Sequence, residues 1–426
     1  MIFRSFFCLL LFPLFLIGCT ELPWSVSEPI PEETPTPTFA PTPTFEPTAT
    51  PAGPGTLRLW LPPQFDPDSG DPAGNILQAQ LDAFVDEHPD VRVEVRIKDL
   101  EGPGGMLDTL TTASAAAPLT LPDLVALPRP MLEAAALKGL LQPIDELSES
   151  INDPDWYDYA RQLGRLQDST FGLPFAGDAM VLVYRPETVS EPPSTFTAAL
   201  ETQGPLAFPA ADPQALFTFA LYQAAGGSLL DDQGRPFLDA DTLTEVLTFY
   251  HDGATVELMP FWLTQYATDE QSWGAFSEHL AEIVITWTTR YLDVGANDTG
   301  VAHMPTSDGV HFTLADGWVW ALVNQNTGHQ ELSVELAEHL TGSEFLSEWT
   351  SAIGYLPPRP SALAGWKPVR MRSLVDQVSS SAQLIPPSDV LTSLGPTLQD
   401  ATIQVLKLEN DPRIAADEAA ESLSGP

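Results

Sequence analysis

The side chains that most often carry catalysis are scattered along this sequence. Its seven histidines form no pair three or four residues apart, either with one another or with a set of carboxylates. There is no G-x-S-x-G string, no phosphate-binding glycine loop, no G-x-G-x-x-G and no H-E-x-x-H. Asp231-Asp232-Gln233-Gly234 begins like a calcium loop, but the alternating ligands and the closing glutamate are missing, so we predict a hairpin turn. We expect no enzyme, no metal and no cofactor, although a carboxylate pair assembled only by folding, as in glycosidases, stays open.

Cysteine chemistry is confined to the start of the chain. Both cysteines, Cys8 and Cys19, lie there, so the rest of the chain has no disulfide and no cysteine-based metal site. The apolar run over residues 6–17 follows a single cation; it has the length of a secretory signal and is too short to span a bilayer core of about 30 Å. It ends in Leu16-Ile17-Gly18-Cys19, which resembles the bacterial lipobox. We predict a signal peptide over residues 1–18 and a lipid on Cys19; an ordinary signal peptide with a chance cysteine, or a buried core segment, are the alternatives.

Residues 19–54 are predicted to form a spacer. Proline and threonine alternate over residues 34–38 and 41–44, and few residues of the segment would suit a core. This composition favours extended polyproline geometry at about 3.1 Å per residue. A lipid followed by a spacer implies a globular body held off a membrane, on its extracellular or periplasmic side. A disordered tail would serve the same mechanical purpose.

The formal charge of −40, from 18 basic against 58 acidic residues, argues against two kinds of partner. It opposes binding to nucleic acid, and it opposes adsorption of the body to anionic lipid. The charge bears on solubility and on partners, and leaves the fold open.

The apolar pattern after the spacer predicts a strand–helix–strand unit. Residues 57–61 suit a strand, apolar residues at helical spacing over 76–85 stop at His88-Pro89, and valines alternate with charged residues over 91–97. Such a unit forms a parallel sheet with a crossover helix. A helix over 106–117, a strand over 123–127 and a helix over 131–138 extend it.

The rest of the chain continues this alternation. Strands are predicted over 171–175 and 180–184 with a loop between them, and also over 283–287 and 318–323. Helices are predicted over 195–202, 213–225, 241–252 and around 332–340, with one or two more over 388–408. About 370 residues of alternating elements exceed one comfortable domain, so we expect two α/β lobes.

Six short strings occur in the order found in a known family. They are Pro122-Asp123 before a strand, Gly139-Leu140-Leu141, Phe171-Gly172-Leu173-Pro174 running on to Tyr184, residues 226–236, Asp316-Gly317-Trp318, and Gly354-Tyr355-Leu356-Pro357. In these strings, over residues 56–410, the chain resembles the family 1 extracellular solute-binding proteins of sugar importers of the ABC type, which include maltose-binding proteins.

That resemblance implies an architecture. It is an α/β, two-lobe fold of the type II periplasmic-binding-protein kind, each lobe a mixed, mostly parallel sheet flanked by helices, with the ligand cleft between the lobes. The resemblance assigns residues 55–176 and 307–342 to the N-terminal lobe. It assigns residues 177–306 and 343–426 to the C-terminal lobe.

The resemblance also implies where a ligand would lie. Family members close on a ligand by a hinge motion, and sugar sites combine carboxylates for the hydroxyl groups with aromatic planes for the C–H faces of the rings. Several of the ten tryptophans stand where strands end, which is where sites open in α/β sheets. On this basis we expect ligand contacts from Trp60, Phe65, Asp178, Asp212, Trp287, Trp318 and Tyr355. For Trp60 the alternative is core packing, for Asp178 an exposed turn, and for Asp212 a helix cap.

Departures from the family pattern leave the ligand open. A glycine is missing from segment 276–283, Arg185 replaces an asparagine, and Leu127-Pro128-Arg129-Pro130 stands where maltose-binding relatives carry an aromatic residue and a charged pair.

We predict a monomeric, lipid-anchored receptor that delivers an oligosaccharide or a related polyol to an ABC permease. A receptor that signals to a membrane sensor and a lipid-anchored glycan-active enzyme are the alternatives. Arg129 and Arg290 keep an amino-acid or peptide ligand open.

Overall fold

The computed structural model describes residues 55–294, 298–323, 327–367 and 369–423, and its contacts place all of them in one unit. The predicted signal peptide, Cys19 and the spacer lie outside the described residues. None of the helices in the described ranges is both long and apolar enough to cross a bilayer.

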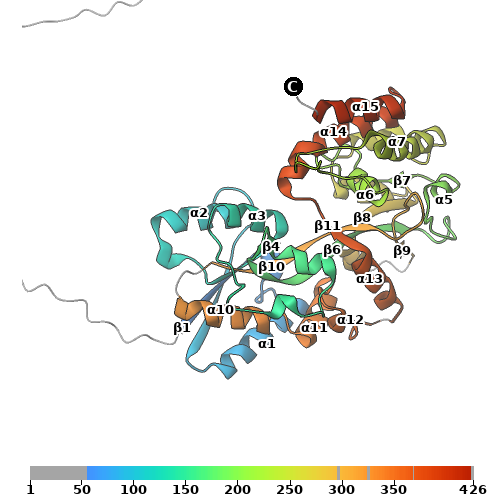
Figure 1. Cartoon of the computed structure of the whole chain (residues 1–426). Coiled ribbons are helices and arrows are strands. Elements are labelled where there is room, and N and C mark those ends of the chain that lie inside the picture. The colour runs from blue at the N-terminus through green and yellow to red at the C-terminus, as the bar shows by residue number, and fades with distance from the viewer. Residues whose placement is uncertain (1–54, 295–297, 324–326, 368, 424–426) are drawn as a thin grey trace, which may run out of the picture. The chain divides into compact units, whose positions relative to one another are not determined.

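One sheet runs through the described residues, with the strand order β2-β1-β3-β10-β6-β8-β7; β11 pairs with β10 and β9 with β6 (Figure 1). The pairs β1-β2, β1-β3, β7-β8 and β10-β11 are parallel. The pairs β3-β10, β6-β10, β6-β8 and β6-β9 are antiparallel. The strands are β1 (Gly55–Leu61), β2 (Val91–Ile97), β3 (Leu124–Pro128), β6 (Gly172–Tyr184), β7 (Leu206–Ala207), β8 (Ile283–Trp287), β9 (Gly300–Ala302), β10 (Thr313–Leu322) and β11 (Ala382–Leu384), with β4 (Arg165–Leu166) and β5 (Ser169–Thr170) forming a separate hairpin.

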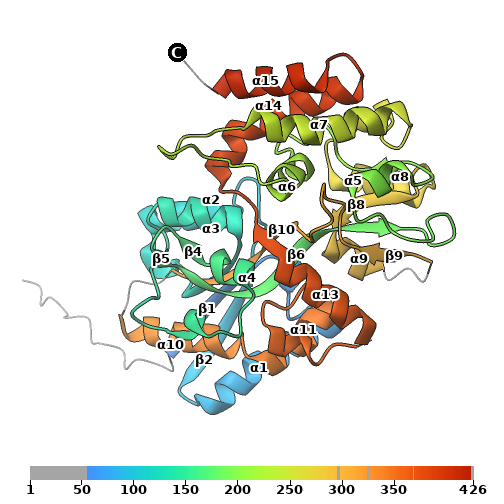
Figure 2. The same cartoon turned by 45° about the vertical axis from the view of Figure 1, so that its right-hand side comes forward.

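Helices cover both faces of this sheet (Figures 1 and 2). The α-helices are α1 (Pro72–Glu87), α2 (Met106–Ala116), α3 (Arg129–Leu137), α4 (Asp158–Leu163), α5 (Phe196–Leu200), α6 (Leu216–Ala224), α7 (Ala240–Thr255), α8 (Asp269–Ser277), α9 (Thr288–Val294), α10 (Thr327–His339), α11 (Ser343–Ile353), α12 (Pro360–Leu363), α13 (Val369–Ser381), α14 (Ser388–Leu406) and α15 (Pro412–Leu423). Single 3-10 turns are η1 (Pro63–Phe65), η2 (Pro118–Thr120), η3 (Ser150–Asn152) and η4 (Phe261–Gln265).

β1 illustrates how the sequence assigns the two faces. Leu57, Leu59 and Leu61 join the core cluster that contains residues of α1, α10 and α11, whereas Trp60 joins the cluster that contains residues of α2 and α3. The predicted strand–helix–strand unit is therefore confirmed. The helix of this unit begins at Pro72, because Asp71 caps it by accepting a hydrogen bond from the Gly74 amide at 2.7 Å and a proline follows the cap.

The predicted loop between residues 175 and 180 is wrong, because β6 is one strand of 13 residues. Pro174 and Gly177 are local strand-breaking signals. Pairing with β10 overrides both: a register shift occurs next to Pro174, and Gly177 lies opposite Gly317. A side chain at Gly177 would collide with the Tyr159 hydroxyl, so this glycine permits a close approach of α4. Asp178 consequently lies in a strand and not in an exposed turn.

The other predicted elements are mostly confirmed, with shifted ends. The helix predicted from residue 213 begins at Leu216, because Ala215 has a φ of 50° and breaks the helical path. The strand predicted over 318–323 begins earlier, at Thr313. The turn at Asp231 is confirmed: its amide donates to the Arg235 carbonyl at 2.9 Å. A single helix, α14, covers the region of one or two predicted helices, with Pro396 inside it.

The C-terminal segment is divided between two parts of the body. α11 packs on α1, and Phe345, Leu346 and Trp349 belong to the core cluster of β1 and α1. α14 and α15 pack instead on α7. This packing does not match a boundary at residue 342, because the apolar face of α11 is buried against α1. We propose that residues 343–363 belong with the first lobe.

Candidate functional site

A cavity of about 520 Å³ lies over β6 and β10, the two paired strands that connect the two halves of the sheet. Its floor comes from β6 and β10, one side from the end of β8 and from α9, and the other from the turn after α11. The lining residues are Pro128, Asp178, Asp269, Trp287, Thr289, Arg290, Asp293, Asp316, Gly317, Trp318 and Tyr355. Four of the seven predicted contacts thus meet in one cavity: Asp178, Trp287, Trp318 and Tyr355.

Asp178 is fixed by α9. Its Oδ1 accepts hydrogen bonds from the Thr288 hydroxyl at 2.6 Å and the Thr289 amide at 3.0 Å, and its Oδ2 accepts one from the Thr289 hydroxyl at 2.6 Å. The Ala179 amide donates a further bond at 2.9 Å. Burial raises the pKa of Asp178 to about 6, although these hydrogen bonds act in the opposite direction. The carboxylate therefore ties β6 to α9 and keeps one edge toward the cavity.

Asp316, which the sequence prediction missed, lies opposite Asp178 in the antiparallel pairing of β6 and β10. Directly opposed residues of such strands have Cβ atoms about 4.5–5.5 Å apart. Its Oδ1 accepts a hydrogen bond from the Gly317 amide at 2.7 Å. Burial, together with the negative charge of Asp178, raises the pKa of Asp316 to about 7, although the hydrogen bond from the Gly317 amide acts in the opposite direction. The only sequence signal was its place in the string Asp316-Gly317-Trp318, since the strand register that gives it a partner is not local.

Two aromatic residues of the cavity share a buried support. The Phe65 ring lies edge-on to Trp318 at a centroid distance of 4.8 Å and to Tyr355 at 5.7 Å. Phe65 itself is 2% exposed and does not line the cavity, so it supports the two rings from behind and does not offer the predicted ligand contact. Burial raises the pKa of Tyr355 to about 12, which keeps its hydroxyl protonated as a donor. Trp287 lines the cavity from β8.

Trp60 and Asp212 lie outside this cavity. Trp60 is 2% exposed in the core, with the Lys98 ammonium 5.2 Å from its ring centre, which matches the core alternative. Asp212 lines a neighbouring cavity of about 150 Å³ that shares Asp269 and Trp287 with the larger one. It accepts hydrogen bonds from the amides of Gln214 and Leu216 and so orders the turn before α6, whose N-cap is Ala215 and not Asp212.

The charges around the cavity are mainly negative. Four aspartates line it together with a single cation among the lining residues, Arg290, whose Nε lies 3.0 Å from Asp269 Oδ2. The other candidate cation, Arg129, is buried and paired with Glu133 at 2.8 Å. It also donates to the carbonyls of residues 162, 163 and 165. An anionic ligand would meet more repulsion than attraction here. Within the described ranges no three metal-binding side chains are grouped to hold an ion.

Comparison with known proteins bears on this architecture. The sequence model described as bacterial extracellular solute-binding protein matches residues 79–372. This chain belongs to that family. The family places the described body outside the cytoplasm, as an extracellular or periplasmic domain.

A curated relative, the maltotriose-binding protein of Pyrococcus abyssi, is 28% identical over 194 residues. The match covers 43% of this chain, which spans only 42% of the relative's length.

Solved structures of sugar-binding proteins share the fold. The cyclic alpha-maltosyl-1,6-maltose binding protein from Arthrobacter globiformis superposes with a TM-score of 0.71 at 17% identity, covering 87% of this chain and 98% of the other. A cyclo/maltodextrin-binding protein complexed with maltotetraose gives 0.70 at 21% identity, covering 88% and 98%. At such identities the likeness concerns the fold alone. The predicted type II periplasmic-binding-protein fold is thereby confirmed.

Proposed function

We propose that this solute-binding protein captures a neutral oligosaccharide of the maltodextrin kind in the cavity over β6 and β10. The observation that carries the proposal is the meeting of Asp178 and Asp316 with the rings of Trp287, Trp318 and Tyr355 around one space. Carboxylates accept hydrogen bonds from sugar hydroxyls, and aromatic planes pack on the C–H faces of sugar rings. Both kinds of group are present on more than one side.

The relatives support a ligand made of glucose units. One is named for maltotriose and one structure contains maltotetraose. The excess of aspartates at the cavity disfavours anionic saccharides and amino acids, because the Arg290 charge is already paired with Asp269. Arg129 offers no free charge to a ligand carboxylate, since Glu133 and three carbonyls occupy it.

Capture would proceed by closure of the two lobes, since β6 and β10 are the strands common to both halves of the sheet. We further propose that a lipid on Cys19 and the spacer over residues 19–54 hold a monomeric body near an ABC permease, which would receive the sugar. A tether of this kind raises the effective concentration of the body at the permease without fixing its orientation. Signalling to a membrane sensor would need the same closure, with a different partner.

One observation also bears on the enzyme alternative. The facing pair Asp178 and Asp316 is a carboxylate pair in a cavity, as retaining glycosidases require at about 5–5.5 Å. Asp178, however, is engaged by four hydrogen-bond donors, which leaves little freedom for attack on a sugar carbon. The family match likewise favours binding over turnover.

The test is a panel of ligands on the purified protein, followed by calorimetry and thermal unfolding. Maltose, maltotriose and maltotetraose are compared with a polyol, a glucuronide and a dipeptide. A ligand at a hundred times its Kd should stabilise the fold by about 2.7 kcal/mol. If no saccharide raises the melting temperature while another class does, the sugar proposal fails. Release of shorter sugars from maltotetraose would favour the enzyme alternative.

A further inference from the structure

The turn that carries Tyr355 to the cavity leaves α11 and joins β6 at once. Gly354 has a φ of 80°, the left-handed conformation that commonly ends a helix. Leu356 exchanges two backbone hydrogen bonds with Gly177 of β6, each 2.8 Å long. Because Gly177 directly precedes Asp178, this pair holds the start of the turn against the floor of the cavity.

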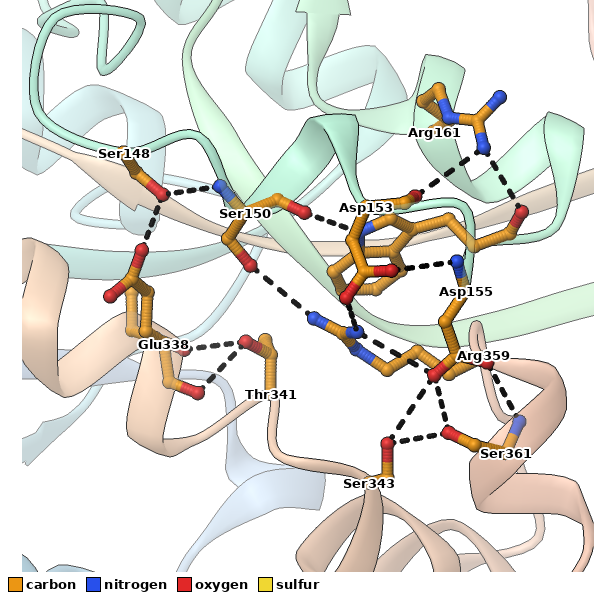
Figure 3. A network of polar contacts seen from close by, with 12 residues as sticks. Ser148, Ser150, Asp153, Asp155, Arg161, Glu338, Thr341, Ser343, Arg359 and Ser361 are labelled. Carbon is orange, nitrogen blue, oxygen red and sulfur yellow. Dashed lines mark hydrogen bonds and ion pairs between the residues drawn. The ribbon is translucent and has the colours of Figure 1, made fainter.

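Arg359 holds the other end of the turn (Figure 3). Its guanidinium lies 3.7 Å from the centre of the Trp156 ring. Its Nη1 lies 3.3 Å from Asp153 Oδ2 and 3.6 Å from Asp155 Oδ2, and its Nη2 donates to Ser150 Oγ at 3.3 Å. The arginine side chain is only 10% exposed, so water competes weakly for these contacts. We call Arg359 with Ser150, Asp153, Asp155 and Trp156 the Arg359 clamp.

Further hydrogen bonds join the same two segments. The Tyr157 amide donates to the Pro358 carbonyl at 3.1 Å, and the Ser361 amide donates to Asp155 Oδ1 at 3.0 Å. Trp156 is oriented in turn by its indole Nε1, which donates to the Ser150 carbonyl at 2.8 Å. Residues 150–157 and 354–361, which lie about two hundred positions apart in the sequence, therefore form one unit.

The choice of arginine at this place has a physical meaning beyond filling space. Burying a charge is costly, and an apolar side chain would pack on Trp156 without that cost. The Nε of Arg359 is also buried without a hydrogen-bond partner among the described residues, which adds to the cost. The guanidinium instead fixes orientation, because its planar array of N–H donors holds several acceptors at defined angles at once.

We propose that Arg359 is a positioning residue of the ligand site. It orients residues 354–359 so that the Tyr355 ring stands against Phe65, the residue that also supports Trp318, before any ligand arrives. A ligand then finds both rings in place, and less of its binding free energy is spent on ordering the turn. This inference rests on the proposed function, since only a ligand that contacts Tyr355 would respond to the clamp.

The first test compares three variants for affinity toward maltotriose by calorimetry. Arg359→Met keeps packing on Trp156 but loses the ion pairs, and we expect its Kd to rise about tenfold. Arg359→Lys keeps the charge and loses the planar guanidinium group, so we expect a Kd between those of the unaltered protein and Arg359→Met. The matched control is Arg161→Met, because Arg161 contacts the carbonyls of Asp153 and Trp156 and not the turn. It should leave the Kd within about twofold.

A double-mutant cycle separates positioning from general damage. If Arg359 acts through Tyr355, then Arg359→Met should cost no further affinity in a Tyr355→Ala protein. The same loss in both backgrounds would overturn the positioning role.

A measurement without ligand keeps this inference distinct from the sugar proposal. The Leu356 amide should exchange with deuterium about tenfold faster in Arg359→Met, while β8 amides stay unchanged. Unchanged exchange at Leu356 would overturn the positioning role whatever the ligand is. Faster exchange in the variant, with no saccharide bound by the unaltered protein, would support the positioning role and overturn only the sugar ligand. Arg359→Lys serves the same measurements if Arg359→Met does not fold.

Discussion

The two strands at the floor of the cavity each present one aspartate at the same register, yet the two regions around them differ. On β6, Asp178 accepts four hydrogen bonds, three of them from the first turn of α9. On β10, Asp316 accepts one among the contacts of the described residues, from the amide of the next residue. Position on a sheet therefore does not decide the role of a carboxylate. Asp178 joins two elements of the fold, whereas Asp316 lines the cavity with fewer bonds to the protein, and we propose that it accepts a hydrogen bond from a ligand.

Removing Asp178 should have the largest effect on stability. Asp178→Ala would leave the hydroxyls of Thr288 and Thr289 without their acceptor, and buried groups left unpaired cost about 1–3 kcal/mol each. Relief of repulsion with Asp316 offsets part of this, so we expect a net loss of about 3 kcal/mol in the free energy of unfolding by urea titration. Asp293→Ala, an exposed lining residue, is the control and should change stability by less than about 0.5 kcal/mol. Equal losses of unfolding free energy in Asp178→Ala and Asp293→Ala would contradict a special role of Asp178 in the fold.

Removing the charge of Asp316 should instead affect binding. In Asp316→Asn the facing charges no longer repel, so stability should hold or rise, while a charged acceptor for sugar hydroxyls is lost. Hydrogen bonds to charged groups contribute about 1.5–3 kcal/mol, which corresponds to a Kd for maltotriose raised at least tenfold. Calorimetry and urea titration on the same preparation separate the two effects. A variant that loses stability and keeps its affinity would assign Asp316 to the fold.

The same pair predicts a dependence of stability on pH. The pKa of Asp316 rises from an ordinary 3.8 to about 7 in the folded protein, so between these values the folded state binds more protons than the unfolded one. The free energy of unfolding contributed by this group therefore falls as pH rises through that window, by at most about 1.4 kcal/mol per pH unit. Carboxyls with lowered pKa values, such as Asp71, act in the opposite direction at lower pH. We therefore expect the decline only as a difference between the unaltered protein and Asp316→Asn. Parallel stability curves for the two proteins from pH 4 to pH 7 would contradict it.

These aspartates also show which features of the structure can be predicted from the sequence alone. Alternation over residues 91–97 predicted β2 because the pattern of that strand is local. The sequence pattern alone divides β6 in two, because the pairing of Gly177 with Gly317 comes from a strand about 140 positions away. Asp316 was missed for the same reason, since its partner is set by register.

The aromatic residues show the same limit from another side. Trp318 and Tyr355 were placed at the site through resemblance to a family, and both line the cavity. Phe65 was expected beside them, but it packs behind them at 2% exposure. Spacing predicts that a loop residue is near a site, while packing among distant rings decides whether it faces the ligand.

The smallest expected effect tests the hydrogen bonds of Asp178 one at a time. Thr289→Val removes only the hydroxyl that donates to Asp178 Oδ2 at 2.6 Å and keeps the side-chain shape. We expect a loss of about 1 kcal/mol in the free energy of unfolding, because the backbone and Thr288 donors remain. Thr286→Val, on the neighbouring strand, is a strict control: its buried hydroxyl has no hydrogen-bond partner among the described residues, so removing it should be neutral or stabilising. If the two valine variants lose the same free energy of unfolding, the hydrogen bond from the Thr289 hydroxyl contributes nothing to stability. Asp178 is then held by its remaining donors. If only Thr289→Val is destabilised, α9 holds Asp178 through specific hydrogen bonds that Asp316 lacks.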